Sequence, residues 1–370
     1  MPRSACTRRT VLRASLAATA ALAAPRLSRA APPRVAFVNP GWSNEDFWRS
    51  VTAVAQAAAE QLGFALDVAY AERNPLRMKE LGREAAASRP DYLMIVNEVR
   101  TAGFVLEEAE RLSVRTFLLN NAFIGEDLER YGQPRAKFAS YIGALLPDNE
   151  SAGHLMGKRL IAAVRAAGLA AGGTVTLAAI SGILTTPAAA ERADGLKRAI
   201  DEDGKAELVH HVAVNWTREE GADRASAILR RHPQVNAIWC ANDPIALGAI
   251  DSAVAAGRKP GRDIFLSGLN WAPAALEAVR DGRLELSVGG HFMAGGFALV
   301  LLRDHMDGKD FAVAVGGARQ AMPFASLDRN NIDAYTARFG ARDWRAIGFA
   351  RFRRGDSLRY DFSPTRILES

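Results

Sequence analysis

Short apolar runs alternate with longer segments of helical periodicity along most of the chain. Runs at 35–38, 65–70, 92–96 and 116–119 are typical of buried strands, and helical segments at 45–62, 75–88 and 104–111 separate them. Strands joined by helical crossovers form parallel sheets with right-handed connections and helices on both faces. The alternation therefore predicts an α/β fold built on a doubly wound parallel sheet.

A second series of the same kind begins at Val175. Turn-forming residues at 141–149 and at Gly289-Gly290 mark candidate crossovers between the two series. We expect two doubly wound parallel-sheet lobes joined by a multi-strand hinge, comprising residues 31–143 with 291–320 and residues 144–290 with 321–370. The second lobe is expected to hold strands at 175–180, 208–214, 237–240, 264–267 and 284–288, with helices at 187–201, 218–231, 244–256 and 273–280.

The first thirty residues carry the pattern of an export signal. Arg8-Arg9 precede an alanine-rich apolar tract that ends at Ala24, and Ser28-Arg29-Ala30 supplies small residues for cleavage. This arrangement predicts a twin-arginine signal peptide over residues 1–30 and a protein of the periplasm. The apolar tract is too short to span a bilayer. The alternative interpretation is the basic N-terminus of a cytosolic protein.

The overall positive charge resides in that N-terminal segment. The chain has 47 Lys and Arg against 41 Asp and Glu, and six arginines but no acid lie in residues 1–30, so signal removal leaves 41 of each. The charge balance therefore does not favour nucleic-acid binding. Cys240 would be the one remaining cysteine, which excludes an intrachain disulfide. No metal or cofactor site is expected, because the adjacent His210 and His211 point apart on a strand.

Polar and aromatic residues follow the expected strands. Ligands of parallel α/β sheets bind outside the carboxyl ends of the strands. The loops so selected are 39–48, 97–98, 120–121, 181–192, 215–216, 241–243 and 269–271, together with His291. Their amides, carboxylates, arginine and tryptophans suit a neutral polyhydroxylated ligand, since polar groups bind hydroxyls and an aromatic face covers a sugar ring. Asn242 and Asp243 are alternatively caps of the helix that Pro244 opens.

Three sequence motifs carry a family resemblance. They are Asn-Glu-Asp-Phe-Trp at 44–48, Glu-Arg-Ala-Asp-Gly at 191–195 and Ala-Asn-Asp-Pro-Ile-Ala-Leu-Gly-Ala at 241–249. With them the chain resembles the type I periplasmic solute-binding proteins of the sugar-binding, ribose/galactose-like group. Residues 40–48 and 90–93 are also similar to the periplasmic autoinducer-2 receptor. The resemblance covers nearly the whole chain after the signal and implies the two-lobed fold.

The resemblance also implies a set of ligand contacts. Where the group carries an aromatic residue and an aspartate, this chain has Leu269 and Asn270, which makes Trp271 the candidate stacking residue. Where a Gln or Arg is typical, the chain has Gly290 followed by His291, a further candidate. These departures argue against a standard aldopyranose and against the autoinducer. The remaining implied contacts are Ser43, Glu45, Phe47 or Trp48, Asn97, Asn121, Arg192, Asn242 and Asn270.

The leading hypothesis is a monomeric periplasmic solute-binding protein that closes on a small sugar-like ligand and delivers it to an ABC transporter. The alternative is a ligand-sensing partner of a membrane sensor kinase, cyclase or chemoreceptor, which would use the same fold. An enzyme is not expected, because the sequence has no nucleophile elbow and no metal-ligand helix motif. The Arg- and aromatic-rich segment 338–354 is expected to pack over the second lobe or the hinge.

Overall fold

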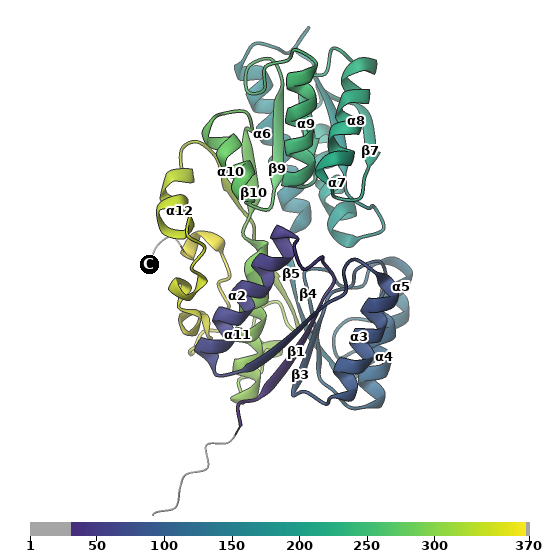
Figure 1. Cartoon of the computed structure of the whole chain (residues 1–370), viewed down its shortest axis with the longest axis vertical. Helices are drawn as coiled ribbons and strands as arrows, with labels where there is room; N and C mark the ends of the chain where they lie inside the picture. The colour runs from purple at the N-terminus through teal and green to yellow at the C-terminus, as the bar shows by residue number, and fades with distance from the viewer. Residues whose placement is uncertain (1–30, 368–370) are drawn as a thin grey trace, which may run out of the picture. The chain divides into compact units, whose positions relative to one another are not determined.

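The computed structural model describes residues 31–367, which form two six-stranded sheets with helices packed against them (Figure 1). This architecture confirms the predicted α/β class with two doubly wound lobes. The expected export signal of residues 1–30 lies outside the described residues. Within the described part of the chain, no helix is long and apolar enough to cross a membrane.

The first sheet has the strand order β11-β5-β4-β3-β1-β2, and each neighbouring pair is parallel. Helices α2 and α11 pack together on one face, while α3 and α4 pack together on the other (Figure 1). The strands are β1 (Arg34–Asn39), β2 (Ala65–Tyr70), β3 (Tyr92–Ile95), β4 (Thr116–Leu119), β5 (Tyr141–Pro147) and β11 (Arg319–Met322). The helices are α2 (Asp46–Leu62), α3 (Pro75–Ala87), α4 (Ala102–Arg111), α5 (Gly125–Tyr131) and α11 (Ala294–Met306).

The second sheet has the order β12-β10-β9-β8-β6-β7 and is parallel except for β12, which runs antiparallel to β10. Helix α6 packs on α7, and α8 packs on α9. The strands are β6 (Val175–Ser181), β7 (Ala206–Ala213), β8 (Ala237–Cys240), β9 (Phe265–Leu269), β10 (Leu286–Gly289) and β12 (Ala325–Leu327). The helices are α6 (Asn149–Ala166), α7 (Pro187–Asp203), α8 (Arg218–Arg231), α9 (Asp243–Ala255) and α10 (Pro273–Arg280).

The chain passes between the sheets three times: after β5, after β10 and between β11 and β12. The expected lobe boundaries differ from these crossings. A boundary after Gly143 falls inside β5, whose whole length belongs to the first sheet. Gly143 pairs with Phe117 inside the strand, and glycine is needed there because a Cβ would lie 2.5 Å from the Phe311 ring. The strand instead ends at Pro147, where Asp148 caps α6 through a hydrogen bond from the Ser151 amide.

Residues 328–367, here called the C-terminal strap, contact elements of both sheets. The strap contains α12 (Ile332–Phe339) and three short 3₁₀ helices, η4 (Trp344–Ile347), η5 (Phe349–Phe352) and η6 (Pro364–Ile367). Helix α12 packs on α10 of the second lobe, whereas η4 and η5 pack on α2, and η5 also on α11. The sequence predicts that residues 321–370 belong to the second lobe alone, whereas in the structure this segment also packs on helices of the first lobe. The buried rings of the strap extend the core over the hinge.

An ion pair fixes the strap beside the start of α2. The Arg342 guanidinium donates to both carboxylate oxygens of Asp46, at 2.6 and 3.1 Å, and to the Ser50 hydroxyl at 2.6 Å. On the other side, Arg280 of α10 donates to the Thr336 hydroxyl of α12 at 3.1 Å. The strap is thus attached to both lobes by polar contacts as well as by packing.

Helices α6 and α7 approach to backbone contact because each has a glycine at the crossing. A Cβ at Gly153 would lie 2.0 Å from the Arg192 carbonyl oxygen, and one at Gly195 would lie 2.0 Å from that of Glu150. Any larger residue must push the helices apart. This crossing fixes where α7 presents Arg192.

We therefore predict that Gly195→Ala lowers thermal stability. Overpacking against backbone costs about 1–3 kcal/mol, and the better helix propensity of alanine offsets up to about 1 kcal/mol of it. Circular dichroism melting measures the change. Gly355→Ala is the control, since a Cβ at Gly355 meets nothing within 4 Å. Equal melting temperatures for Gly195→Ala and the parent chain would contradict the backbone-contact argument.

Candidate functional site

A cavity lies where the carboxyl ends of strands from both sheets meet. It encloses about 530 Å³, part of it open to solvent. Its walls come from loops after β1 to β5 on one side and from loops after β6 to β10 on the other. The lining residues are Glu45, Phe47, Trp48, Arg73, Glu98, Asn120, Asn121, Pro147, Asn149, Thr186, Ala188, Arg192, Trp216, Asn242, Asn270 and His291.

Most of the candidate site residues line this cavity. The structure brings together Glu45, Phe47, Trp48, Asn121, Arg192, Asn242, Asn270 and His291. Ser43, Asn97 and Trp271 are not among the lining residues. The cavity therefore gathers residues that are separated by more than 200 positions in the sequence, as the rule for strand ends predicts.

The three candidates outside the lining have local structural roles. The exposed Ser43 donates its amide to the Glu72 carboxylate at 3.2 Å. The Asn97 side chain donates to the Ala122 carbonyl at 3.0 Å and accepts from an amide at the start of α4, so it joins two loops. Trp271 donates through its indole nitrogen to the Ser287 carbonyl at 3.0 Å and packs edge-on against a strap ring. Neighbouring backbone groups and a ring thus hold the side chains of Asn97 and Trp271, whereas the contact of Ser43 is made by its backbone amide.

The sequence candidates omitted several lining residues. Arg73 follows β2, whose end is outside the loops selected from the sequence. The rule that ligands bind at the carboxyl ends of parallel strands points to this residue as well. Glu98, Asn120 and Trp216 lie in loops that the rule did select, but they were not singled out there. Asn149 opens α6 directly after β5, where the sequence indicates only a turn. The other omitted residues are Pro147, Thr186 and Ala188.

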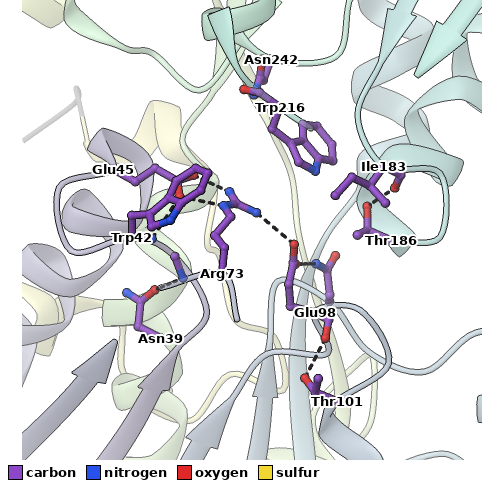
Figure 2. A network of polar contacts seen from close by, with 12 residues as sticks. Asn39, Trp42, Glu45, Arg73, Glu98, Thr101, Ile183, Thr186, Trp216 and Asn242 are labelled. Atoms are coloured by element: carbon purple, nitrogen blue, oxygen red, sulfur yellow. Dashed lines mark hydrogen bonds and ion pairs between the residues drawn. The ribbon is translucent and has the colours of Figure 1, made fainter. Parts of the chain in front are cut away.

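Arg73 joins two glutamates on the first wall of the cavity. Its guanidinium donates to both oxygens of Glu45, at 2.5 and 2.9 Å, and to Glu98 at 3.1 Å (Figure 2). Burial raises the pKa of the Glu98 carboxyl, against the opposing effect of Arg73. The second oxygen of Glu98 accepts from the Asn121 amide at 3.3 Å. The two acids and the arginine thus satisfy one another, with a net charge of −1 when both acids are ionised.

Arg192 projects from the opposite wall, and its side chain is buried with 4% exposure. Its Nε donates to Asn149 Oδ1 at 3.0 Å and its Nη1 to the Ala241 carbonyl at 2.9 Å. The guanidinium lies 5.8 Å from the ring centroids of both Trp216 and Phe324. Burial lowers the pKa of Arg192 to about 10, so the group remains a cation at neutral pH.

Several buried polar atoms at the cavity have no hydrogen-bond partner among the described residues. They are both amide atoms of Asn120, the Oδ1 of Asn121 and the Nδ1 of His291. Leaving such a group unpaired costs about 1–3 kcal/mol. Native proteins keep few of them, and they are concentrated at sites where a ligand or water supplies the partner. Asn120, Asn121 and His291 all line the cavity, so their unpartnered atoms are candidates for bonds to a ligand or to water.

Backbone strain is concentrated at the same strand ends. Asn120, Trp216 and Asn270 have positive φ angles of 62°, 67° and 142°. A non-glycine residue in this region costs of order 1–3 kcal/mol and persists where the surrounding structure holds it. Each of the three lines the cavity. The strained backbone positions are thus part of the loops that form the cavity walls.

Two adjacent residues after β8, Asn242 and Asp243, have different structural roles. Asn242, not Asp243, is the N-cap of α9: its Oδ1 accepts from the Ile245 amide at 2.9 Å. Its Nδ2 donates to the Trp216 carbonyl at 3.0 Å, which leaves the side chain little freedom to bind a ligand. Asp243 instead accepts from the Ala272 amide and the Ser287 hydroxyl, both at 2.8 Å. The expectation that Asp243 is only a cap was wrong, because its carboxylate joins α9 to the loop after β9.

His291 lies just after β10, at the start of a short 3₁₀ helix, with its ring against Phe47. The ring centroids lie 4.5 Å apart in a stacked arrangement, and Phe324 covers another side at 4.8 Å. Burial, with a smaller effect of Arg192, lowers the pKa of His291 well below its usual value. The imidazole is therefore neutral at pH 7 and offers one donor and one acceptor.

Comparison with known proteins identifies the family. A family model described as a periplasmic binding protein domain matches residues 35–310. A crystal structure of a periplasmic sugar-binding protein from Pseudomonas fluorescens is similar with a TM-score of 0.81 and 36% identity, covering 91% of this chain and 99% of that one. The chain belongs to the type I periplasmic sugar-binding proteins, which confirms the resemblance seen in the sequence.

Curated relatives are more distant. The galactofuranose-binding protein YtfQ of Escherichia coli strain K12 is 25% identical over 71% of this chain and 78% of its own length. The D-apiose import binding protein of Actinobacillus succinogenes is 27% identical over 75% of this chain and 87% of its own length. These proteins bind different sugars by name, so family membership alone does not define one ligand for this chain.

We predict that His291 makes folding stability depend on pH. Because its pKa is lower in the folded than in the unfolded protein, the folded state binds fewer protons, and the stability contribution is lost as pH falls below about 6.5. In His291→Gln, the decrease in unfolding free energy between pH 7.5 and 5.5, measured by urea titration, should be smaller than in the parent. His154→Gln, at a partly exposed helical position, is the control. An unchanged decrease in His291→Gln would show that His291 is not buried as described.

Proposed function

We propose that this protein binds one small polyhydroxylated, sugar-like molecule in the cavity and delivers it to an ABC transporter. The observation that supports this most is the convergence of unpartnered polar atoms of Asn120, Asn121 and His291 on the cavity that Arg192 also lines. Hydroxyl groups of a sugar both donate and accept, so they satisfy amide, imidazole and guanidinium groups together. Transport is proposed because the relatives above include an import binding protein.

Two aromatic rings would complete the recognition. Trp216 points toward the cavity from the second wall (Figure 2), and Phe47 lines it from the first. An aromatic face against the C–H surface of a sugar ring adds apolar contact that hydroxyls cannot provide. Together with charge-assisted hydrogen bonds of about 1.5–3 kcal/mol each, such stacking is sufficient for micromolar affinity, which requires about 8 kcal/mol.

The division of the cavity between two walls suggests how binding is coupled to movement. Asn120 and Asn121 belong to the first lobe, whereas Arg192 and Asn270 belong to the second. A ligand that contacts both walls binds a closed arrangement better than an open one, and it shifts the equilibrium by that difference in affinity. A closed, ligand-bound form is the state that a transporter would recognise. We propose that the protein works as a monomer in this cycle.

We predict that Arg192→Ala weakens binding by about 30-fold or more, since loss of a buried charged partner costs about 2 kcal/mol or more. Calorimetry of the purified chain would use D-ribose, D-galactose, L-arabinose, D-glucose and the corresponding sugar acids. Arg198→Ala is the matched control, because Arg198 lies on α7 but pairs with Glu150 on the surface. Absence of saturable heat for every compound would contradict the proposed function, and unchanged affinity in Arg192→Ala would remove that residue from the site.

We also propose that residues 1–30 direct export to the periplasm through the twin-arginine route, on the basis of their sequence. Replacement of Arg8 and Arg9 by lysine should retain the protein in the cytoplasm, as measured by cell fractionation and immunoblotting. Arg13→Lys, which leaves the arginine pair intact, should be exported like the parent. Periplasmic recovery of the double variant at parental levels would contradict this route.

A further inference from the structure

We propose that the ligand carries a carboxylate and that Arg192 receives it, so the substrate class is a sugar acid rather than a neutral sugar. This inference rests on the proposed function and narrows it. It follows from the way in which charged groups are paired around the cavity. Arg192 is left without an anion, while the acids that line the cavity are already paired with Arg73.

The guanidinium of Arg192 keeps most of its hydrogen-bonding capacity. An arginine has five N–H donors, and Arg192 uses one on Asn149 and one on the Ala241 carbonyl. One N–H of Nη1 and both of Nη2 have no partner among residues 31–367. The edge formed by Nη1 and Nη2 therefore remains available. That edge matches the two oxygens of a carboxylate, which arginine binds through a pair of parallel hydrogen bonds.

Arg192 also has no direct ion-pair partner among the described residues. Within the described chain, no carboxylate lies within ion-pair distance of its guanidinium. The charges of Glu191 and Asp243 act on Arg192 from beyond that distance. Glu191 is linked to it through Asn149, whose amide nitrogen donates to Glu191 at 3.0 Å while its oxygen accepts from Arg192. A buried cation without a counter-ion is costly, and the cost is removed when a bound anion pairs with it. The rings of Trp216 and Phe324, each 5.8 Å from the guanidinium, offer it aromatic faces but no anionic charge.

The acids of the cavity cannot fill this role. Both oxygens of Glu45 and one of Glu98 accept from Arg73, and the other Glu98 oxygen accepts from Asn121. All three guanidinium nitrogens of Arg73 are in turn occupied. The remaining polar side chains of the walls are amides, an imidazole and a hydroxyl, namely Asn120, Asn121, Asn149, Asn242, Asn270, His291 and Thr186.

This charge pattern also orients the ligand. With both acids ionised, the first wall carries a net charge of −1 through Glu45, Arg73 and Glu98, and the second carries the positive charge of Arg192. A carboxylate is repelled from the first wall and attracted to the second. The hydroxyls of the same molecule then face Asn120 and Asn121, whose unpartnered atoms include both donors and acceptors. A phosphate dianion fits less well, because a single uncompensated cation faces it.

The test is calorimetry at pH 7.5 with matched pairs: D-ribose and D-ribonate, D-galactose and D-galacturonate, L-arabinose and L-arabinonate, and D-glucose and D-gluconate. We expect at least one acid to bind 30-fold or more tightly than its neutral partner. A neutral sugar that binds as tightly as its acid, or more tightly, overturns this inference and leaves the proposed function standing. Preference for D-ribose 5-phosphate over every carboxylate also overturns it. A response from none of the compounds counts against both proposals.

Two substitutions separate the carboxylate role from a general loss of structure. Arg192→Lys keeps the charge but loses the forked edge, so the preferred acid should bind at least 10-fold more weakly. Asn270→Asp places an anion in the cavity and should lower the ratio of acid affinity to neutral-sugar affinity by 10-fold or more. Arg198→Gln is the control and should leave both affinities unchanged. Equal effects of Asn270→Asp on acid and neutral ligand would overturn the inference.

Discussion

Parallel strand pairing is the constraint on which this structure depends. Strands that run in one direction must be connected by crossovers, and those crossovers place every loop after a strand at the same edge of its sheet. Here two such sheets present those edges to a common cavity, so loops from ten strands contribute to its walls. The arrangement explains why residues as distant in sequence as Glu45 and His291 line one space. The residues that line the cavity are therefore brought together by the positions of the strand ends.

Electrostatic pairing then decides which of those residues remain available. Glu45, Glu98 and Arg73 carry three of the charges at the cavity, yet they are bonded to one another. Asn242 lines the cavity as well, but its amide caps a helix and binds a neighbouring carbonyl. A list of polar lining residues thus overstates the number that can bind a ligand. What remains after internal pairing is Arg192, a few amides and a neutral imidazole, set between aromatic rings.

Much of the fold could be predicted from the sequence because buried parallel strands are continuous apolar runs. The run at 92–96 and the helix beginning at Pro75, for example, appear in the structure within a residue or two of the predicted bounds. Strands β11 and β12 were not predicted, since each has only three or four residues and exists through pairing with β5 or β10. The position of the C-terminal strap depends on tertiary contacts in the same way, so local periodicity carries no signal for it.

The site was predictable to the level of loops but not of single side chains. The rule for strand ends selected the loops that hold Glu98, Asn120 and Trp216, whereas it cannot show which residue of a loop points inward. Trp271 illustrates the difficulty: it follows Asn270 directly, yet its indole is held by a carbonyl of β10 and by Tyr335. A second difficulty is that a residue's role can depend on distant partners. Arg73 is an example, because the two acids that it pairs with lie 28 residues before it and 25 residues after it.

The C-terminal strap has a mechanical consequence for the two lobes. Two bodies joined by one flexible segment can turn about any axis, but each further connection removes some of that freedom. In this protein the chain crosses between the lobes three times, and the strap adds a fourth connection because it packs on α10 of one lobe and on α2 of the other. Phe292, on the second crossing, contacts Trp271 of one lobe and Trp344 of the strap, so these connections share one aromatic cluster. A rotation of the lobes that keeps these ring contacts intact would have to pivot close to Phe292.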